Sequence, residues 1–155
     1  MTNINRFSFG STAAIVAGMA LGAGLDAAAL PKSAIVSSLL IVAIADNLTD
    51  SLSIHVYQES ERLEPVRAFL ATLSNFGARL VVSLSFVLIV VLAPSRGVVA
   101  ASLAWGLALL AALSWMIARQ RRVRPLPEVA KHVLVAVAVI FLSQSLGEWI
   151  PARFG

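Results

Sequence analysis

The sequence predicts an all-α integral membrane protein, a bundle of five transmembrane helices that forms a single domain over residues 1–155. Three observations lead to this fold class. Apolar residues make up 59% of the chain and charged residues only 13%, whereas soluble domains carry about 25% charged residues. The mean hydropathy is +0.87. Several apolar stretches approach the roughly 20 residues that a helix needs to cross a bilayer. Too few residues remain outside these stretches for a soluble catalytic domain.

The five expected spans follow one another with short connections. They lie at about residues 8–29, 33–57, 68–93, 98–118 and 128–150. We expect helices because a lone segment in lipid must satisfy its own backbone hydrogen bonds. Prolines or charged residues interrupt the apolar pattern at Leu30–Lys32, Glu59–Arg67, Pro94–Gly97 and Arg119–Pro127.

The first span carries two features that admit more than one reading. Ala14, Gly18 and Gly22 recur at four-residue spacing, which lets helix backbones approach closely, either inside the chain or at a dimer contact. Arg6, the apolar stretch and the run Ala27–Ala29 also match the pattern of a cleaved signal peptide. We expect the segment to be retained as a span.

The basic residues predict the orientation, because cytoplasmic loops are enriched in Lys and Arg. An N-terminus inside puts eight of them on the inner side: Arg6, Arg62, Arg67, Arg119, Arg121, Arg122, Arg124 and Lys131. Three are then outside: Lys32, Arg96 and Arg153. The net charge of +4 is thereby explained without nucleic acid. The absence of a targeting extension leads us to expect a prokaryotic inner (plasma) membrane.

The stretch ADNLTDSLSIHVYQESE, residues 45–61, places acidic residues at the end of an apolar run. The short loop that follows makes spans two and three antiparallel neighbours. Measured from the loop midpoint near residue 62.5, Asp46 and Arg79 are both 16.5 residues away. Asp50 mirrors Asn75 in the same way. Buried charges are normally paired, so we expect an Asp46–Arg79 ion pair.

Asp50 is then the less compensated acid, one helical turn from Asp46 on a shared face. Two neighbouring carboxylates can hold a hard divalent cation or share a proton, and Asn47 could add a carbonyl oxygen. The alternative is that Asp50 only satisfies Asn75. His55 and Glu59, also one turn apart, are either further metal ligands or an ordinary solvated pair.

The order of spans resembles that of the vacuolar iron transporter family of divalent-metal carriers. Span two matches the family's A-D-x-L pattern at Ala45, Asp46 and Leu48, and continues with Leu52, Ser60 and Glu61. Span one keeps Phe9, Gly10 and Val16, and span five resembles the closing helix of the family, including Gly147. The resemblance implies a homodimer with a metal path between its two protomers. It also implies that divalent iron or manganese is exported from the cytosol in exchange for protons.

The chain departs from the family at three places. The first-span Asp-Gly is replaced by Ala13-Ala14, and Asp50 stands where the family has a Met on span two. The long acidic insert is reduced to Glu59, Glu61 and Glu64. Either the acid has moved from span one to span two, which favours manganese, magnesium or calcium over iron, or transport has been lost.

These observations predict a proton-coupled exchanger of a divalent cation, with Asp46, Asp50 and Asn47 in the path and no covalently bound cofactor. The alternative is a non-transporting scaffold or modulator in which Asp46 and Arg79 form a structural ion pair. An enzyme is not expected. The pair Asp46 and Asp50 lacks the Gly and Arg residues that accompany metal-binding acids in head-group transferases, and the chain has no cysteine.

Overall fold

The computed structural model describes residues 3–61 and 64–154, and over these residues the chain forms helices joined by short connections, without strands. The helices are α1 (Asn3–Ala27), α2 (Lys32–Ser60), α3 (Pro65–Leu92), the short 3-10 helix η1 (Ser95–Gly97), α4 (Val98–Gln120) and α5 (Pro125–Phe154). The five predicted spans are confirmed as helices. Arg62, which the charge count assigns to a loop, lies outside the described residues.

Several helix ends differ from the sequence prediction: α1 begins five residues earlier than predicted, α2 ends three residues later, and α3 and α5 each begin three residues earlier, at a proline. The fifth span is predicted at 128–150, yet α5 begins at Pro125 and continues through Pro151 to Phe154. Proline is tolerated in the first helical turn, where backbone N–H groups have no partner within the helix. Within a helix it removes one backbone hydrogen bond, and Pro151 does so only in the last turn.

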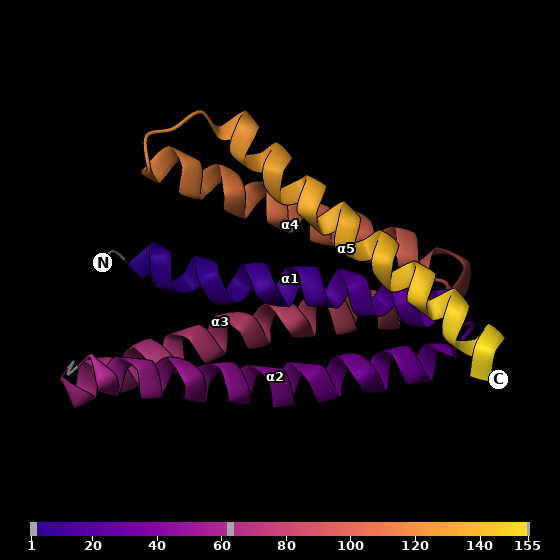
Figure 1. The fold of residues 1–155 in the computed structure, drawn as a ribbon, viewed down its shortest axis with the longest axis horizontal. Helices are drawn as coiled ribbons and strands as arrows, with labels where there is room; N and C mark the ends of the chain where they lie inside the picture. Colours follow the sequence, from indigo (N-terminus) through magenta and orange to yellow (C-terminus); the bar gives the residue numbers. More distant parts are fainter. Residues whose placement is uncertain (1–2, 62–63, 155) are drawn as a thin grey trace.

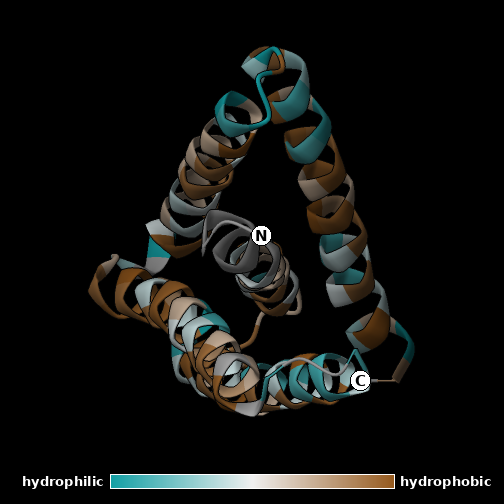
Figure 2. Ribbon diagram, turned by 90° about the vertical axis from the view of Figure 1, so that its left-hand side faces the viewer, coloured by the Kyte–Doolittle hydropathy of each residue, from teal (hydrophilic) through white to brown (hydrophobic). Residues whose placement is uncertain are grey.

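Helix α1 lies at the centre and packs against each of the other four helices. Helices α2 and α3 form an antiparallel hairpin on one side, and α4 and α5 diverge from it on the other (Figure 1). Viewed end-on, α1 lies within a three-sided frame formed by the α2–α3 pair, α4 and α5 (Figure 2). The N-terminus, the α2–α3 turn and the α4–α5 turn share one end of the bundle (Figure 1).

Small residues allow α1 its central position. A Cβ at Gly18 would lie 2.8 Å from Phe86 of α3, and one at Gly147 would overlap the carbonyl of Gly24. Close backbone approach at glycine is the usual way for helices to pack in a membrane. The spacing of Ala14, Gly18 and Gly22 thus serves packing inside the chain at Gly18, whereas a Cβ at Gly22 would meet nothing within 4 Å.

Lys32, the first residue of α2, bonds to the end of α3. Its Nζ donates to the carbonyl oxygens of Val91 (2.8 Å) and Ala93 (2.9 Å) at the end of α3. The last carbonyls of a helix have no partner within it and carry its negative dipole end. A single ammonium group therefore fastens the start of α2 to the end of α3.

Large apolar side chains cover the outside of the bundle. Leu52, Leu92, Leu134 and Phe141 are each more than 60% exposed. All five helices are long and apolar enough to cross a membrane, and only 17% of the most apolar stretch of α5 is buried inside the chain. An outward apolar surface of this extent is typical of lipid contact, so the chain is an integral membrane protein.

Candidate functional site

The α2–α3 hairpin gathers the intramembrane charges around one arginine. Arg79 of α3 is buried, and its Nη2 forms an ion pair with Asp46 Oδ2 of α2. The two residues lie at equal distances from the turn, so antiparallel packing brings them level. The pairing of Asp46 with Arg79 that the depth argument predicts is therefore present.

Asp50 is not the less compensated acid that the sequence suggests. Its Oδ2 lies 3.2 Å from Arg79 Nη1 and accepts a hydrogen bond of 3.1 Å from Asn75 Nδ2. The hydrogen bond to Asn75 is the alternative that the sequence leaves open for Asp50, whereas the contact with Arg79 is not predicted. The planar guanidinium has several donors, so one arginine can serve carboxylates on successive turns of the facing helix.

Asn47 completes the cluster from the buried side of α2. Its Oδ1 accepts a hydrogen bond of 2.7 Å from Arg79 Nε, and the residue is 1% exposed. The oxygen that the sequence offers to a cation is thus occupied by Arg79. Its Nδ2 has no hydrogen-bond partner in the protein.

The two carboxylates differ in their surroundings. The side chain of Asp50 is 27% exposed and that of Asp46 is 52% exposed, against 3% for Arg79. Asp46 is the middle residue of α2, a helix of 29 residues. Because a span needs only about 20 residues, this exposed carboxylate lies near the middle of the apolar layer.

Gly10 explains how α1 passes this cluster. A Cβ at this position would overlap Asn75 Oδ1 and lie 2.9 Å from the Arg79 side chain. From the sequence, Gly10 is noted only as a residue shared with the vacuolar iron transporter family. Its role here is steric, since only glycine lets α1 approach the polar centre of the hairpin.

A small cavity of about 10 Å³ lies beside Asp46, between α1, α2 and α3. It is lined by Ala14, Ala17, Gly18, Leu39, Val42, Asp46 and Ser83. This is room for about one water molecule. The carboxylate of Asp46 and the hydroxyl of Ser83 are the polar side-chain groups that face it, and Ser83 was not identified from the sequence.

His55 and Glu59 form a separate pair nearer the turn. Their Nε2 and Oε1 atoms are 3.4 Å apart, and the side chain of Glu59 is 65% exposed. Among the described residues, no three His, Asp or Glu side chains converge as a metal-ligand group. The four predicted ligands are therefore divided between two places, Asp46 with Asp50 around Arg79, and His55 with Glu59 at the turn.

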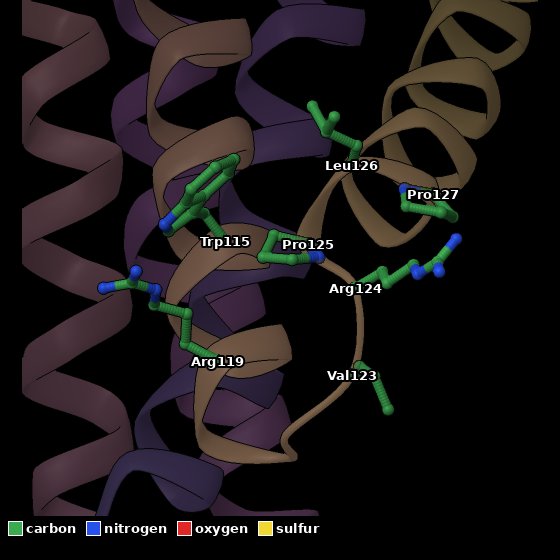
Figure 3. Close-up of a pocket in the computed structure, with 7 residues that line it drawn as sticks. All are labelled: Trp115, Arg119, Val123, Arg124, Pro125, Leu126 and Pro127. Carbon is green, nitrogen blue, oxygen red and sulfur yellow. The ribbon is translucent and has the colours of Figure 1, made fainter.

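A larger cavity lies elsewhere, at the α4–α5 turn. It measures about 580 Å³ and is lined by Trp115, Arg119, Val123, Arg124, Pro125, Leu126 and Pro127. Arg119 and Arg124 extend from it in opposite directions, and Trp115 lies beside Pro125 (Figure 3). Its charged side chains are both basic, which disfavours a cation at this site.

Comparison with protein-family models, with curated proteins and with solved structures finds no match. The resemblance to the vacuolar iron transporter family therefore stays a prediction.

Proposed function

We propose that this protein is a secondary carrier that exchanges a divalent cation for protons through Asp46 and Asp50. The observation that carries the proposal is the half-exposed carboxylate of Asp46 on the middle residue of a spanning helix. A charged group at such depth is costly and normally lines a path for ions or protons.

The charge of the cluster supports a cation as substrate. Two carboxylates face one guanidinium, which leaves a formal charge of −1. Arg79 acts in this proposal as a resident counter-ion, and an entering cation competes with it for the exposed carboxylate. Proton binding by the same acids would release the cation, which is what exchange requires.

The donor set favours hard cations. The small cavity has one carboxylate residue, Asp46, and one hydroxyl residue, Ser83, in an otherwise apolar lining, with no thiol or thioether. Manganese, magnesium and calcium prefer oxygen ligands, whereas softer ligand atoms would favour iron(II). We therefore propose manganese, magnesium or calcium ahead of iron.

The proposal includes a homodimer, with the shared end of the N-terminus and the two turns facing the cytoplasm. Ala13 of α1 is exposed, and Asp46 of α2 is half exposed. A second copy against this side would remove both from lipid. The arginines of the α4–α5 turn, Arg121, Arg122 and Arg124, support the orientation.

A second candidate is a non-transporting scaffold, favoured by the contacts of Arg79. The guanidinium engages Asp46, Asn47 and Asp50 at once. Such a cluster could serve only to lock α2 against α3, since a buried charge needs several partners to offset its lost hydration.

Flux measurements distinguish the two candidates. Purified protein in proteoliposomes with a pH gradient is tested for uptake of manganese, magnesium, calcium and iron(II). The carrier predicts uptake that falls at least tenfold in Asp50→Asn, because neutralising the acid removes both its cation and its proton affinity. Glu148→Gln, an exposed acid of α5, is the matched control. A helical, monodisperse wild type without flux of any of these ions would support the scaffold.

A further inference from the structure

The buried face of α2 is apolar in the first half of the helix and polar in the second half. Toward the α1–α2 connection it carries Ile35, Leu39 and Ala43, all at most 4% exposed. Toward the α2–α3 turn the same face carries polar residues in the buried or partly buried positions Asn47, Ser51, His55 and Gln58. These four recur at intervals of three or four residues, so they form one row along the helix.

Each member of this row has a buried atom without a hydrogen-bond partner in the protein. The atoms are Asn47 Nδ2, Ser51 Oγ, His55 Nδ1 and Gln58 Oε1. Asn47, Ser51 and Gln58 are 1%, 6% and 9% exposed. Leaving such a group unsatisfied is unfavourable because it loses its hydrogen bonds to water on burial, so four in a row require a common explanation.

The other hydroxyls of α2 show that Ser51 is exceptional. Thr49 Oγ1 donates to the carbonyl of Ala45 (2.8 Å), and Ser53 Oγ donates to that of Thr49 (2.9 Å). Both residues are exposed, and both satisfy themselves on their own helix, as hydroxyls in apolar surroundings do. Ser51 does not make this bond, and its hydroxyl stays available to a partner in the interface.

Among the side chains of the facing helix that the structure describes, none supplies that partner. At the corresponding depth the buried residues of α3 nearest the turn are Ala68 and Ala71, whose side chains have no hydrogen-bonding atom. The next is Asn75, whose Nδ2 is engaged by Asp50 and whose Oδ1 is also unpartnered. The partner of the row must therefore be small, polar and able both to donate and to accept.

The spacing fits water. Residues one turn apart are separated by about 6 Å along a helix axis. One water molecule with two hydrogen bonds of about 2.8 Å spans nearly the same length. A single file of water molecules would satisfy the row from Gln58 to Asn47, a distance of about 16 Å.

We infer that the half of the α2–α3 interface nearest the turn holds a file of ordered water molecules, which connects the turn with Asn47 and Asp50. The apolar residues Ala43 and Leu39 close the file at its far end. The water itself is independent of cation transport. Its use as the path by which protons reach Asp50 rests on the proposed function.

The experiment uses the absence of cysteine from the sequence, which makes any introduced thiol unique. Ser51→Cys and Ala43→Cys, each a near-isosteric change on the same face, are reconstituted separately in lipid vesicles. The infrared S–H stretching band is followed after transfer from H₂O to D₂O, with no ion gradient. Circular dichroism checks that both variants keep the helical content of the wild type.

The file predicts that the thiol at residue 51 exchanges within the mixing time. The thiol at residue 43 should exchange at least about 100-fold more slowly, because water reaches it only through local opening of the helices. Equal protection at both positions would mean a dry interface and would overturn the inference. Equally fast exchange at both would overturn it too, since the file would then have no closed end.

A second variant pair tests proton delivery. If the wild type carries cations, Ser51→Ala should reduce pH-driven flux several-fold, and Ser53→Ala, which alters an exposed hydroxyl at similar depth, should not. Unchanged flux in Ser51→Ala would overturn the role of the water file as a proton path. The presence of the file itself would then be decided by the thiol exchange experiment. Absence of flux in the wild type would count against the carrier alone.

Discussion

Arg79 and Asp46 form an ion pair across the α2–α3 hairpin whose two ends lie in different surroundings. The guanidinium is 3% exposed and the carboxylate 52% exposed. The guanidinium of Arg79 also contacts Asn47 and Asp50. In the described part of the chain, the carboxylate of Asp46 has its ion pair with Arg79. The guanidinium of Arg79 is therefore held in place by several partners, whereas the carboxylate of Asp46 stays accessible. The carrier proposal depends on the accessible carboxylate, and the scaffold alternative depends on the bound guanidinium.

Replacing Arg79 should destabilise the hairpin strongly. Arg79→Met leaves Asp46 and Asp50 without their counter-charge. Removing one partner of a buried pair costs about 3–5 kcal/mol, and the partial exposure of both carboxylates places the expected loss near the lower end of that range. Unfolding by denaturant in detergent, followed by circular dichroism, measures the loss. Arg153→Met, an exposed arginine at the end of α5, should have little effect.

The triple variant Arg79→Met, Asp46→Asn, Asp50→Asn separates charge from packing. It removes all three charges together, and we expect it to recover at least half of the stability lost in Arg79→Met. If the triple variant is as unstable as the single one, the guanidinium contributes through packing rather than through its charge.

Gly147→Ala should weaken the contact between α5 and α1. The new methyl group would overlap the carbonyl of Gly24 and lie 3.1 Å from the Cβ of Ala27, so the helices must separate. Overpacking of this kind costs about 1–3 kcal/mol. Thermal unfolding of the purified protein in detergent checks the expectation.

Gly22→Ala is the matched control, because a Cβ there would meet nothing within 4 Å. Alanine is a better helix former than glycine by about 1 kcal/mol, so this variant should be neutral or slightly stabilised. Equal destabilisation by the two changes would contradict the packing described for α1.

Lys32→Met should loosen the junction between the start of α2 and the end of α3. The change removes both hydrogen bonds from Nζ to the carbonyl oxygens of Val91 and Ala93. Charged hydrogen bonds contribute about 1.5–3 kcal/mol where they are buried, and the partial exposure of this group places the expected loss near 1 kcal/mol. Denaturant unfolding of Lys32→Met beside the wild type measures it.

Lys32→Arg provides the check on that interpretation. Arginine keeps the charge and the donors, so most of the stability should return. A loss in the arginine variant as large as in Lys32→Met would show that the contact requires the geometry of an ammonium group.

The sequence by itself determined the number and the nature of the helices. Apolar stretches of about 20 residues specify spans because a backbone in lipid must pair with itself. It also predicted that Asp46 meets Arg79, and it offered Asn75 as one of two alternatives for Asp50, because a short turn fixes equal depths in an antiparallel hairpin. Helix ends near Pro125 and Pro151 were misjudged, since proline is compatible with the terminal turns of a helix.

Only the tertiary structure decided how the polar groups share their partners. Depth along a helix says nothing about rotation around it, so the contact of Arg79 with Asp50 as well as Asp46 was not foreseen. The steric role of Gly10 and the orphaned hydroxyl of Ser51 depend likewise on which faces of α1, α2 and α3 meet. Those faces are set by the packing of all the helices together, which no single stretch of sequence encodes.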